Sequence, residues 1–333
     1  MLFRSHYLDS YRIPLPITSS IKQLPSKKFE RFFSVTCKSL KDVTALLAFE
    51  QKYDTDFAYA YNSFRAYPIV QLENSEQAFL ACPIPTLLFW RVTSGLYYEL
   101  YKDPRFASEF GDAIQDYVGD VLREACLSSR IQILAEREYG DGRARKRTVD
   151  WIATDSTAAL FIECKAKRLS LAAKTSLFDT SALESDLAII ASAVVQTYKT
   201  IVDYRSGKYQ HFPFDEKRKI YPLIVTLENW FVFGPDMFKR LDAAVASQCE
   251  IAKIPKSFCE EMSYSVMAMT ELESAIQIMS QVPVAEVMDG KLKDGELRQW
   301  IWQSYLGEKF PKVPRRMLFE DEFEKLCSGL SES

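Results

Sequence analysis

The sequence predicts an α/β protein in which helices and strands follow one another in the middle of the chain. Residues 106–125 carry apolar side chains at the spacing of an amphipathic helix. Residues 130–165 contain three short segments with the composition of strands, followed by a second helical pattern at 182–204 and an apolar strand-like region at 221–233. The predicted order of elements is therefore α-β-β-β-α-β.

The segment 148–168 is predicted to form a β-hairpin. Around Trp151, apolar and polar residues alternate and several are aromatic or β-branched, which is typical of a strand. Ala158–Lys165 is an apolar run that ends in charge and fits a buried strand. Ser156 and Thr157 are the expected loop residues. Neither is ideal for a primed two-residue turn, so a longer loop is the alternative.

With this two-residue loop, Asp150 lies directly opposite Glu163, and Lys165 shares their face because strand side chains alternate. Cys164 then points to the opposite, core face. Facing carboxylates repel each other unless a cation lies between them, and oxygen ligands suit Mg²⁺. We therefore expect Mg²⁺, or Mn²⁺ in its place, to be held by Asp150, Glu163 and the backbone carbonyl of Cys164. A slip of one residue in the register would remove this site.

These groups suit hydrolysis of a phosphodiester. A bound Mg²⁺ polarises a phosphoryl oxygen and lowers the pKa of a bound water. Lys165 would orient that water or help to deprotonate it, and would offset charge on the phosphate. The alternative is a structural salt bridge at the end of a hairpin. Three other acid-x-Lys tripeptides, which begin at Glu50, Asp215 and Asp289, end no apolar strand and predict no site.

The hairpin and its flanks resemble the PD-(D/E)xK nuclease superfamily, across about residues 95–233. Its restriction-endonuclease-like core has the order α-β-β-β-α-β, with a central mixed sheet flanked by helices, and its strand meander carries Asp…Glu-x-Lys. The resemblance implies a Mg²⁺-dependent endonuclease or deoxyribonuclease that leaves a 5′-phosphate, with DNA favoured over RNA. Flanking domains on such cores are common in bacterial defence, so fold analogy also suggests antiphage defence.

The first predicted helix adds a second point of resemblance. Many members carry Phe-Gly-x-x-Phe-Glu-x-Tyr-Val there, with a Glu that assists the metal. Residues 110–118 read Phe-Gly-Asp-Ala-Ile-Gln-Asp-Tyr-Val, so Gln115 takes the place of that Glu. Either Gln115 supports the site without charge, or Glu109 or Glu124 substitutes, or metal binding is weak; a boundary Gln on a surface helix is the alternative. Gln196, in the second helix, resembles a Gln of some members but points away from the apolar stripe, which favours an ordinary surface residue.

Basic residues occur on both sides of the predicted site. Phosphate contacts supply much of the affinity of nucleic-acid-binding proteins, so such residues suit a phosphodiester backbone. For any single one, a solvated hairpin tip is the simpler explanation. The candidates are Arg143, Arg145, Lys146, Arg147, Lys167 and Arg168.

The composition of the chain argues against several classes of protein and of functional site. The net charge of the 333-residue chain is −3, so nucleic-acid binding would need a local basic surface. Seven Cys without a CxxC pair and only two His predict neither a zinc site nor a Cys–His nucleophile, and favour reduced cysteines in a cytoplasmic protein. No targeting segment is visible, and the apolar run 79–90 is short and contains Pro, so no membrane span is expected.

Breaks in these patterns predict three regions. Residues 1–90 are expected to be mainly helical, 91–235 to form the nuclease-like core, and 236–333 to form a helical tail. The helical flanks would serve substrate recognition, a protein partner, a homodimer or only a scaffold. Two alternatives to an enzyme remain open. One is a catalytically silent nucleic-acid-binding module, and the other is a structural or regulatory subunit of a larger complex.

Overall fold

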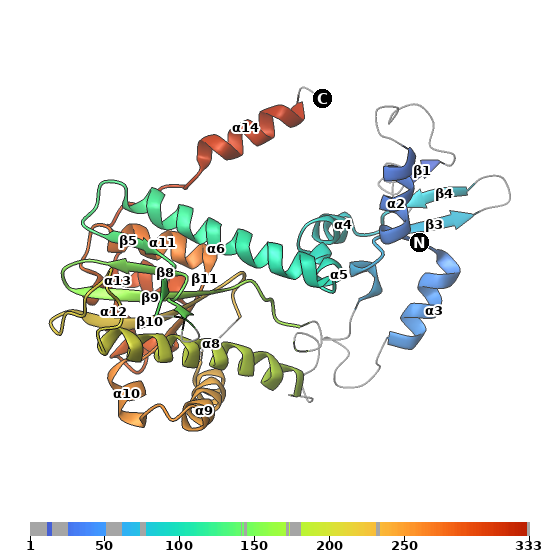
Figure 1. The fold of residues 1–333 in the computed structure, drawn as a ribbon. Helices are drawn as coiled ribbons and strands as arrows, with labels where there is room; N and C mark the ends of the chain where they lie inside the picture. The colour runs from blue at the N-terminus through green and yellow to red at the C-terminus, as the bar shows by residue number, and fades with distance from the viewer. Residues whose placement is uncertain are drawn as a thin grey trace. The chain divides into compact units, whose positions relative to one another are not determined.

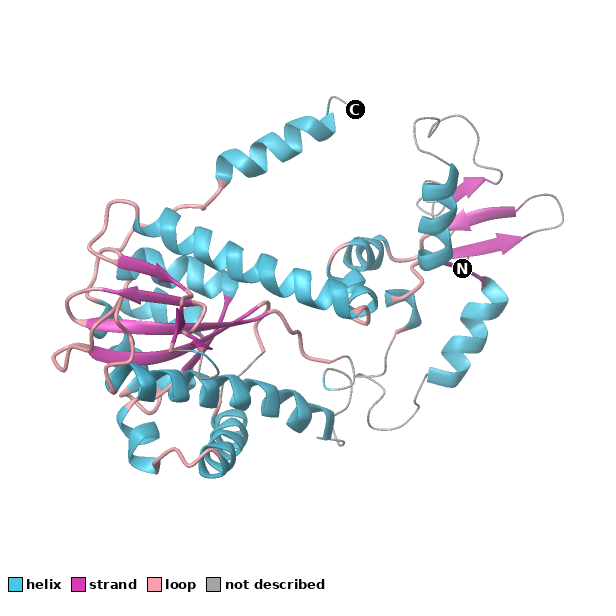
Figure 2. Ribbon diagram, viewed as in Figure 1, coloured by secondary structure: helices cyan, strands magenta, loops and turns pink. Residues whose placement is uncertain are grey.

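The computed structural model describes residues 12–14, 26–50, 62–73, 78–140, 142, 145–170, 173, 181–230 and 234–331. The chain divides into two compact units, residues 1–108 with 174–180, and residues 109–173 with 181–333. Helices and strands occur in both, which confirms the α/β class (Figure 2). Residues 109–173 and 181–235 of the predicted core lie in the same unit as the predicted C-terminal region, whereas residues 91–108 and 174–180 belong to the first unit. None of the described helices combines the length and the hydrophobicity that a membrane span requires.

The first unit contains a small four-stranded sheet that the sequence did not predict. Its strand order is β1-β4-β3-β2, and only the β2–β3 pair is parallel. The strands are β1 (Arg12–Pro14), β2 (Cys37–Ser39), β3 (Ile69–Glu73) and β4 (Ala78–Ala81). The helices are α2 (Ser26–Thr36), α3 (Leu40–Glu50), η2 (Ser63–Arg65), α4 (Pro85–Val92), η3 (Ser94–Leu96) and α5 (Tyr97–Leu100).

The second unit is built around a five-stranded mixed sheet with the order β11-β10-β9-β8-β5 (Figure 1). β5, β8 and β9 form an antiparallel meander, and β10 and β11 run parallel to β9. Their bounds are β5 (Gln132–Ala135), β8 (Trp151–Thr154), β9 (Ala158–Lys165), β10 (Lys219–Thr226) and β11 (Ser265–Ala268). Between β5 and β8, the short strands β6 (Glu138–Tyr139) and β7 (Lys146–Arg147) pair with each other.

Helices cover both faces of this sheet (Figure 1). On one face, Leu160 and Ile162 of β9 belong to a buried cluster with α6 (Pro104–Cys126), α11 (Met269–Met279), α12 (Val284–Leu292) and α13 (Trp302–Lys309). On the other face, Phe161 joins a cluster with α8 (Ser181–Arg205) and α9 (Pro235–Ile251). The remaining helices are α10 (Lys256–Glu261), η5 (Leu297–Gln299) and α14 (Glu320–Ser331). β9 is thus buried on both faces, as its continuous apolar sequence indicates.

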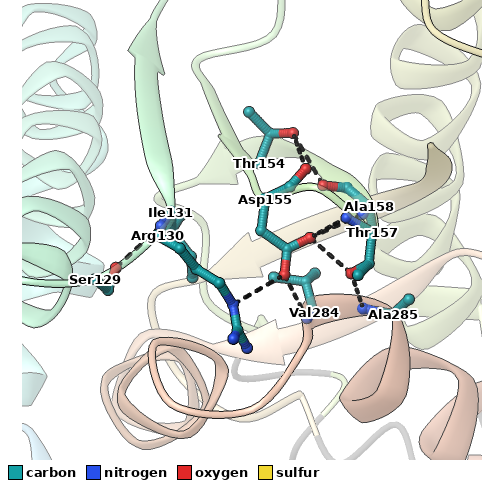
Figure 3. A network of polar contacts seen from close by, with 9 residues as sticks. All are labelled: Ser129, Arg130, Ile131, Thr154, Asp155, Thr157, Ala158, Val284 and Ala285. Atoms are coloured by element: carbon teal, nitrogen blue, oxygen red, sulfur yellow. Dashed lines mark hydrogen bonds and ion pairs between the residues drawn. The ribbon is translucent and has the colours of Figure 1, made fainter.

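The hairpin of β8 and β9 has the predicted two-residue loop. Trp151 lies opposite Ile162 in the ladder, and the backbone N–H of Asp155 donates to the carbonyl of Ala158 at 3.0 Å. Oδ1 of Asp155 accepts hydrogen bonds from the Thr157 backbone N–H (2.7 Å), the Thr157 hydroxyl (2.6 Å) and the Ala158 N–H (2.9 Å) (Figure 3). An Asp side chain that bonds to the backbone in this way closes a turn. Asp155 therefore compensates for loop residues that do not favour a primed turn.

The same turn is joined to the start of α12. Oδ2 of Asp155 accepts from the Val284 N–H at 3.0 Å, and the Thr157 hydroxyl oxygen accepts from the Ala285 N–H at 3.1 Å (Figure 3). Arg130 adds an ion pair to Oδ2, with Nε at 3.6 Å. A carboxylate at a helix N-terminus satisfies its unpaired N–H groups and favours the helix dipole. This network holds one end of the hairpin against the helical layer.

The packing of α6 against β8 depends on Gly119. A Cβ at this position would lie 2.1 Å from the ring of Trp151, whose indole N–H donates to the Gln115 carbonyl at 2.9 Å. We expect Gly119→Ala to lower the free energy of unfolding by about 2 kcal/mol, because the indole must shift out of its packed position. Gly111 is the matched control in α6, with no atom near its added Cβ. Gly111→Ala should stabilise by about 0.5–1 kcal/mol through helix propensity alone.

Urea unfolding followed by circular dichroism measures both changes. Equal stabilisation by the two substitutions would mean that Trp151 does not restrict the approach of α6.

Candidate active site

The residues predicted to form a site lie at one edge of the five-stranded sheet. β9, β10 and β11 are parallel, and β8 runs antiparallel to β9 and β5. The carboxyl ends of β5, β9, β10 and β11 therefore meet at the edge where β8 begins. Asp150 precedes β8, and Glu163 and Lys165 lie at the carboxyl end of β9. In α/β sheets, ligands bind outside the carboxyl ends of the strands, so this edge is a suitable place for chemistry.

Asp150 bridges the two strands of the hairpin where the regular ladder ends. The last ladder pair at this end is Trp151 with Ile162, and Asp150 and Glu163 are the next residues beyond it. Oδ2 of Asp150 accepts a hydrogen bond from the Cys164 backbone N–H at 2.7 Å. The carboxylate thus takes the place of a main-chain acceptor, which holds it between β8 and β9. Cys164 packs against the cluster that includes α6, and its thiol also lies within hydrogen-bonding reach of Asp150.

Glu163 and Lys165 are in direct contact. Nζ of Lys165 lies 2.8 Å from Oε1 of Glu163, as expected for side chains two residues apart on one face of a strand. The Glu163 residue is only 5% exposed, while the Lys165 side chain is 28% exposed. The lysine therefore connects a buried carboxylate to the solvent-facing side of the site.

The electrostatics of Asp150 are unusual for a carboxyl group. Burial, and then the negative charge of Glu163, raise its pKa to about 7. The Cys164 hydrogen bond and the charge of Lys165 act in the opposite direction but do not outweigh burial. Burial also raises the pKa of the Cys164 thiol, with Asp150 and Glu163 adding to the effect. An additional positive charge between Asp150 and Glu163 would relieve this repulsion.

A third carboxylate, Glu136, borders the site and was missed in the sequence. It follows β5, and its backbone N–H donates to the Asp150 carbonyl at 2.8 Å. Burial raises the pKa of Glu136; the charge of Arg147 lowers it, and the charge of Glu163 raises it further. Arg147 Nη1 lies 3.4 Å from Glu136 Oε2. The sequence does show that Glu136 directly follows a predicted strand. It does not show how that strand pairs with the strand that follows Asp150, so Glu136 could not be assigned to the site.

The structure does not place the side chains of the other candidate acids and amides at this site. Gln115 contacts the start of β8 only through its carbonyl, which accepts from the Trp151 indole; among the described contacts its carboxamide bonds to neither Asp150 nor Glu163. Glu109 is exposed on α6, and Glu124 is ion-paired with Arg316. Gln196 is exposed on α8, as the sequence favoured. Of these residues, Gln115 is thus linked to β8, through its backbone carbonyl rather than its side chain.

The predicted basic residues are already engaged with acidic partners. Arg143 lies outside the described residues. Each of the other five forms an ion pair with an acid, and the exposed pairs would exchange readily with phosphate because exposed ion pairs are weak. The pairs are Arg145–Glu138, Lys146–Asp203, Arg147–Glu136, Lys167–Asp186 and Arg168–Glu228. Arg147 is the one whose partner adjoins Asp150.

The acid-x-Lys tripeptide that begins at Asp289 has a structural role. Lys291 is buried, and its ammonium donates to the carbonyls of Leu297, Arg298 and Trp300 at 2.6–2.8 Å. Burial lowers its pKa to about 8. Asp289 is ion-paired with Lys219 and Lys293. An acid-x-Lys tripeptide therefore marks a candidate site only where its strand faces another acid.

Within the described residues, no group of three or more His, Cys, Asp or Glu side chains could hold a metal ion. The candidate site offers two carboxylates, and Mg²⁺ in proteins commonly binds through one or two carboxylates together with several waters. Half-buried Asp150, buried Glu163 and a single lysine fit such a hard cation in charge and in ligand type. The sequence matches no protein-family model and no curated protein.

Proposed function

We propose that the second unit hydrolyses phosphodiester bonds of nucleic acid in a Mg²⁺-dependent reaction. The observation that carries this proposal is the juxtaposition, at one sheet edge, of half-buried Asp150 with the ion pair of Glu163 and Lys165. The order α6-β5-β8-β9-α8-β10 supports it further, since it is the order of the restriction-endonuclease-like core that the sequence resembles.

Each residue has a defined part in this proposal. Asp150 and Glu163 would hold Mg²⁺, with the Cys164 carbonyl as a third oxygen, and the ion would polarise a phosphoryl oxygen and acidify a water. Lys165, held by Glu163, donates to the attacking water or to the phosphate and offsets the negative charge that develops there. Asp150 must lose its proton to bind the cation, and its raised pKa sets the pH range for that step.

The finer features of the proposal come from the resemblance. DNA is the favoured substrate over RNA, cleavage leaves a 5′-phosphate, and the setting is the bacterial cytoplasm, in defence against foreign DNA. Arg147, on the same edge, is the basic residue best placed for a phosphate of the backbone, because its ion pair with Glu136 is largely exposed on the arginine side. A protein partner or a homodimer would dock through the helical flanks.

A catalytically silent nucleic-acid-binding subunit is the second candidate. Gln115, which stands where many members of the superfamily that the sequence resembles carry a Glu, favours it, because an amide adds no charge to hold the cation. Such a subunit would bind nucleic acid and divalent metal without cutting.

Cleavage by the full chain tests the proposal. Supercoiled plasmid, linear duplex, single-stranded DNA and RNA would be incubated with Mg²⁺, Mn²⁺ or EDTA. We expect metal-dependent cutting that falls by about 100- to 10,000-fold in Lys165→Ala, because the water and the phosphate lose their cationic partner. Lys217→Ala is the matched control, since Lys217 belongs to another acid-x-Lys tripeptide and is exposed.

Three results would decide between the candidates. Equal cutting by wild type and Lys165→Ala would refute the assigned site. Mn²⁺ and nucleic-acid binding without cleavage would favour the silent subunit. Absence of both metal binding and cleavage would leave Asp150, Glu163 and Lys165 as a structural ion-pair cluster.

A further inference from the structure

Two thiols lie next to each other on the face of the second unit covered by α8 and α9. Cys249 is near the end of α9, and Cys259 is in α10. Their sulfur atoms are 3.4 Å apart, and the Cys259 thiol donates a weak hydrogen bond to the Cys249 sulfur. The candidate active site uses neither residue, so this pair needs a separate explanation.

The backbone between the two cysteines holds them together. The Ile254 N–H donates to the Cys249 carbonyl at 2.9 Å, so the chain turns back directly after α9. α10 is fixed in turn by Tyr198 of α8, whose hydroxyl donates to the Met262 carbonyl at 2.7 Å and whose ring contacts Phe258. The two sulfurs are thus close because of packing on three helices, and a small movement would bring them to bonding distance.

The pair also borders a cavity. Both cysteines line a space of about 860 Å³ together with Tyr198, Val245, Ile254 and Tyr264. Cys249 is almost fully buried at 3% exposure, whereas Cys259 is half-buried. A small reagent that enters the cavity would therefore meet the Cys259 sulfur more easily than that of Cys249.

We propose that Cys249 and Cys259 form a reversible disulfide on reaction with a hydroperoxide. The Cys259 sulfur attacks the terminal oxygen of the hydroperoxide; the S–O bond forms, the O–O bond breaks and the alcohol, or water, leaves with a proton. Cys259 is then a sulfenic acid, oxidised by two electrons while the peroxide is reduced. The Cys249 sulfur attacks the Cys259 sulfur; the S–S bond forms, the S–O bond breaks and the hydroxide leaves as water with the Cys249 proton.

The order of these two steps follows from the surroundings of the thiols. Burial raises the pKa of Cys249 to about 12, and its contact with Cys259 adds to this, so Cys249 is a poor first nucleophile. Its position beside Cys259 nevertheless makes it the group best placed to resolve a sulfenic acid there. Cys259 is accordingly the residue that reacts with the peroxide, and Cys249 is the resolving residue.

The test is peroxide treatment of the full chain. With hydrogen peroxide, wild-type protein should lose two titratable thiols and become lighter by two hydrogen atoms. Peptide mapping should link Cys249 to Cys259, and dithiothreitol should restore both thiols. Cys82→Ser, which removes another partly buried thiol, should behave like the wild type.

Two variants separate the steps. Cys259→Ser should form no disulfide, and Cys249→Ala should trap a sulfenic acid on Cys259 that dimedone labels. Circular dichroism verifies that each variant is folded. If the buried Cys249→Ala substitution unfolds the protein, the loss of the disulfide in Cys259→Ser is the result that tests the proposal. A disulfide between other cysteines, a disulfide between two chains, or a stable dimedone adduct on Cys259 of the wild type would overturn the proposal.

Discussion

Asp150→Asn is expected to abolish metal-dependent cleavage and, at the same time, to stabilise the metal-free protein above pH 7. Both effects come from one property, the cost of keeping a negative charge next to Glu163 in a buried place. Asn keeps an oxygen that can accept from the Cys164 N–H, so the hydrogen bond that closes the hairpin edge survives. The substitution therefore removes charge with little change of shape.

The direction of the stability change follows from proton linkage. The pKa of Asp150 is about 7 in the folded protein and near 3.8 in the unfolded chain. Between these pH values the folded state keeps a proton that the unfolded state has released, so stability falls as the pH rises through this range. One pKa unit corresponds to about 1.4 kcal/mol, and we expect Asp150→Asn to be more stable by on the order of 2 kcal/mol at pH 8. At pH 4 the two proteins should be nearly equal.

Addition of Mg²⁺ should reverse this order. The cation binds the folded wild type and raises its free energy of unfolding, whereas the variant has lost a ligand and should not respond. Because a proton on Asp150 competes with the cation, the Mg²⁺ response of the wild type should weaken below pH 7. Thermal unfolding at pH 4, 6 and 8, with and without Mg²⁺, measures all of these effects.

Asp116→Asn is the control for this series, since Asp116 is exposed on α6. It should keep the Mg²⁺ response and the pH dependence of the wild type. If Mg²⁺ stabilised Asp150→Asn as strongly as the wild type, the cation would bind elsewhere and the assignment of Asp150 as a ligand would fail.

The hairpin could be predicted from the sequence because its register is a local property. A two-residue loop and strict alternation place Asp150, Glu163 and Lys165 at one end, and the observed pairing of Trp151 with Ile162 agrees. Glu136 could not be assigned in the same way. It joins the site through the pairing of β5 with β8, and the β6–β7 pair lies between those two strands in the sequence, so no loop length fixes their register.

The acidic partners of the basic residues could not be predicted from the sequence either, because they come from other elements of the fold. Lys146 and Lys167 were visible as basic residues, but their partners Asp203 and Asp186 lie on α8, far along the chain. The small sheet of the first unit was missed for a different reason. β1 and β2 have three residues each, and no alternation can be recognised over such a length.

Asp155→Ala is expected to lower the free energy of unfolding by about 3–5 kcal/mol, because it leaves buried donors without an acceptor. The Asp155 side chain is fully buried. Its two oxygens accept from Thr157, Ala158 and Val284, the last of which is 129 residues away (Figure 3). Loss of the carboxylate would weaken the hairpin turn and the start of α12 together.

The pH dependence of this loss should be opposite to that of Asp150. Burial is the largest influence on Asp155 and raises its pKa, but the hydrogen bonds from Thr157, Val284 and Ala158 outweigh burial, so the net pKa is lowered. The stabilising charge is therefore present at neutral pH and is lost as the pH falls below about 4. Urea unfolding should show the full difference between wild type and Asp155→Ala at pH 7, and a smaller one at pH 3.

Two comparisons make the result specific. Thr157→Ser keeps the hydroxyl and the backbone N–H that bond to Asp155, so it should cost far less than Asp155→Ala. Because Asp155 closes the end of the hairpin opposite to Asp150, Asp155→Ala should still cut nucleic acid at temperatures where it remains folded. A loss of stability under 1 kcal/mol would show that water replaces the carboxylate. A loss of cleavage in the folded variant would show that the turn controls the geometry of Asp150 at the far end of the hairpin.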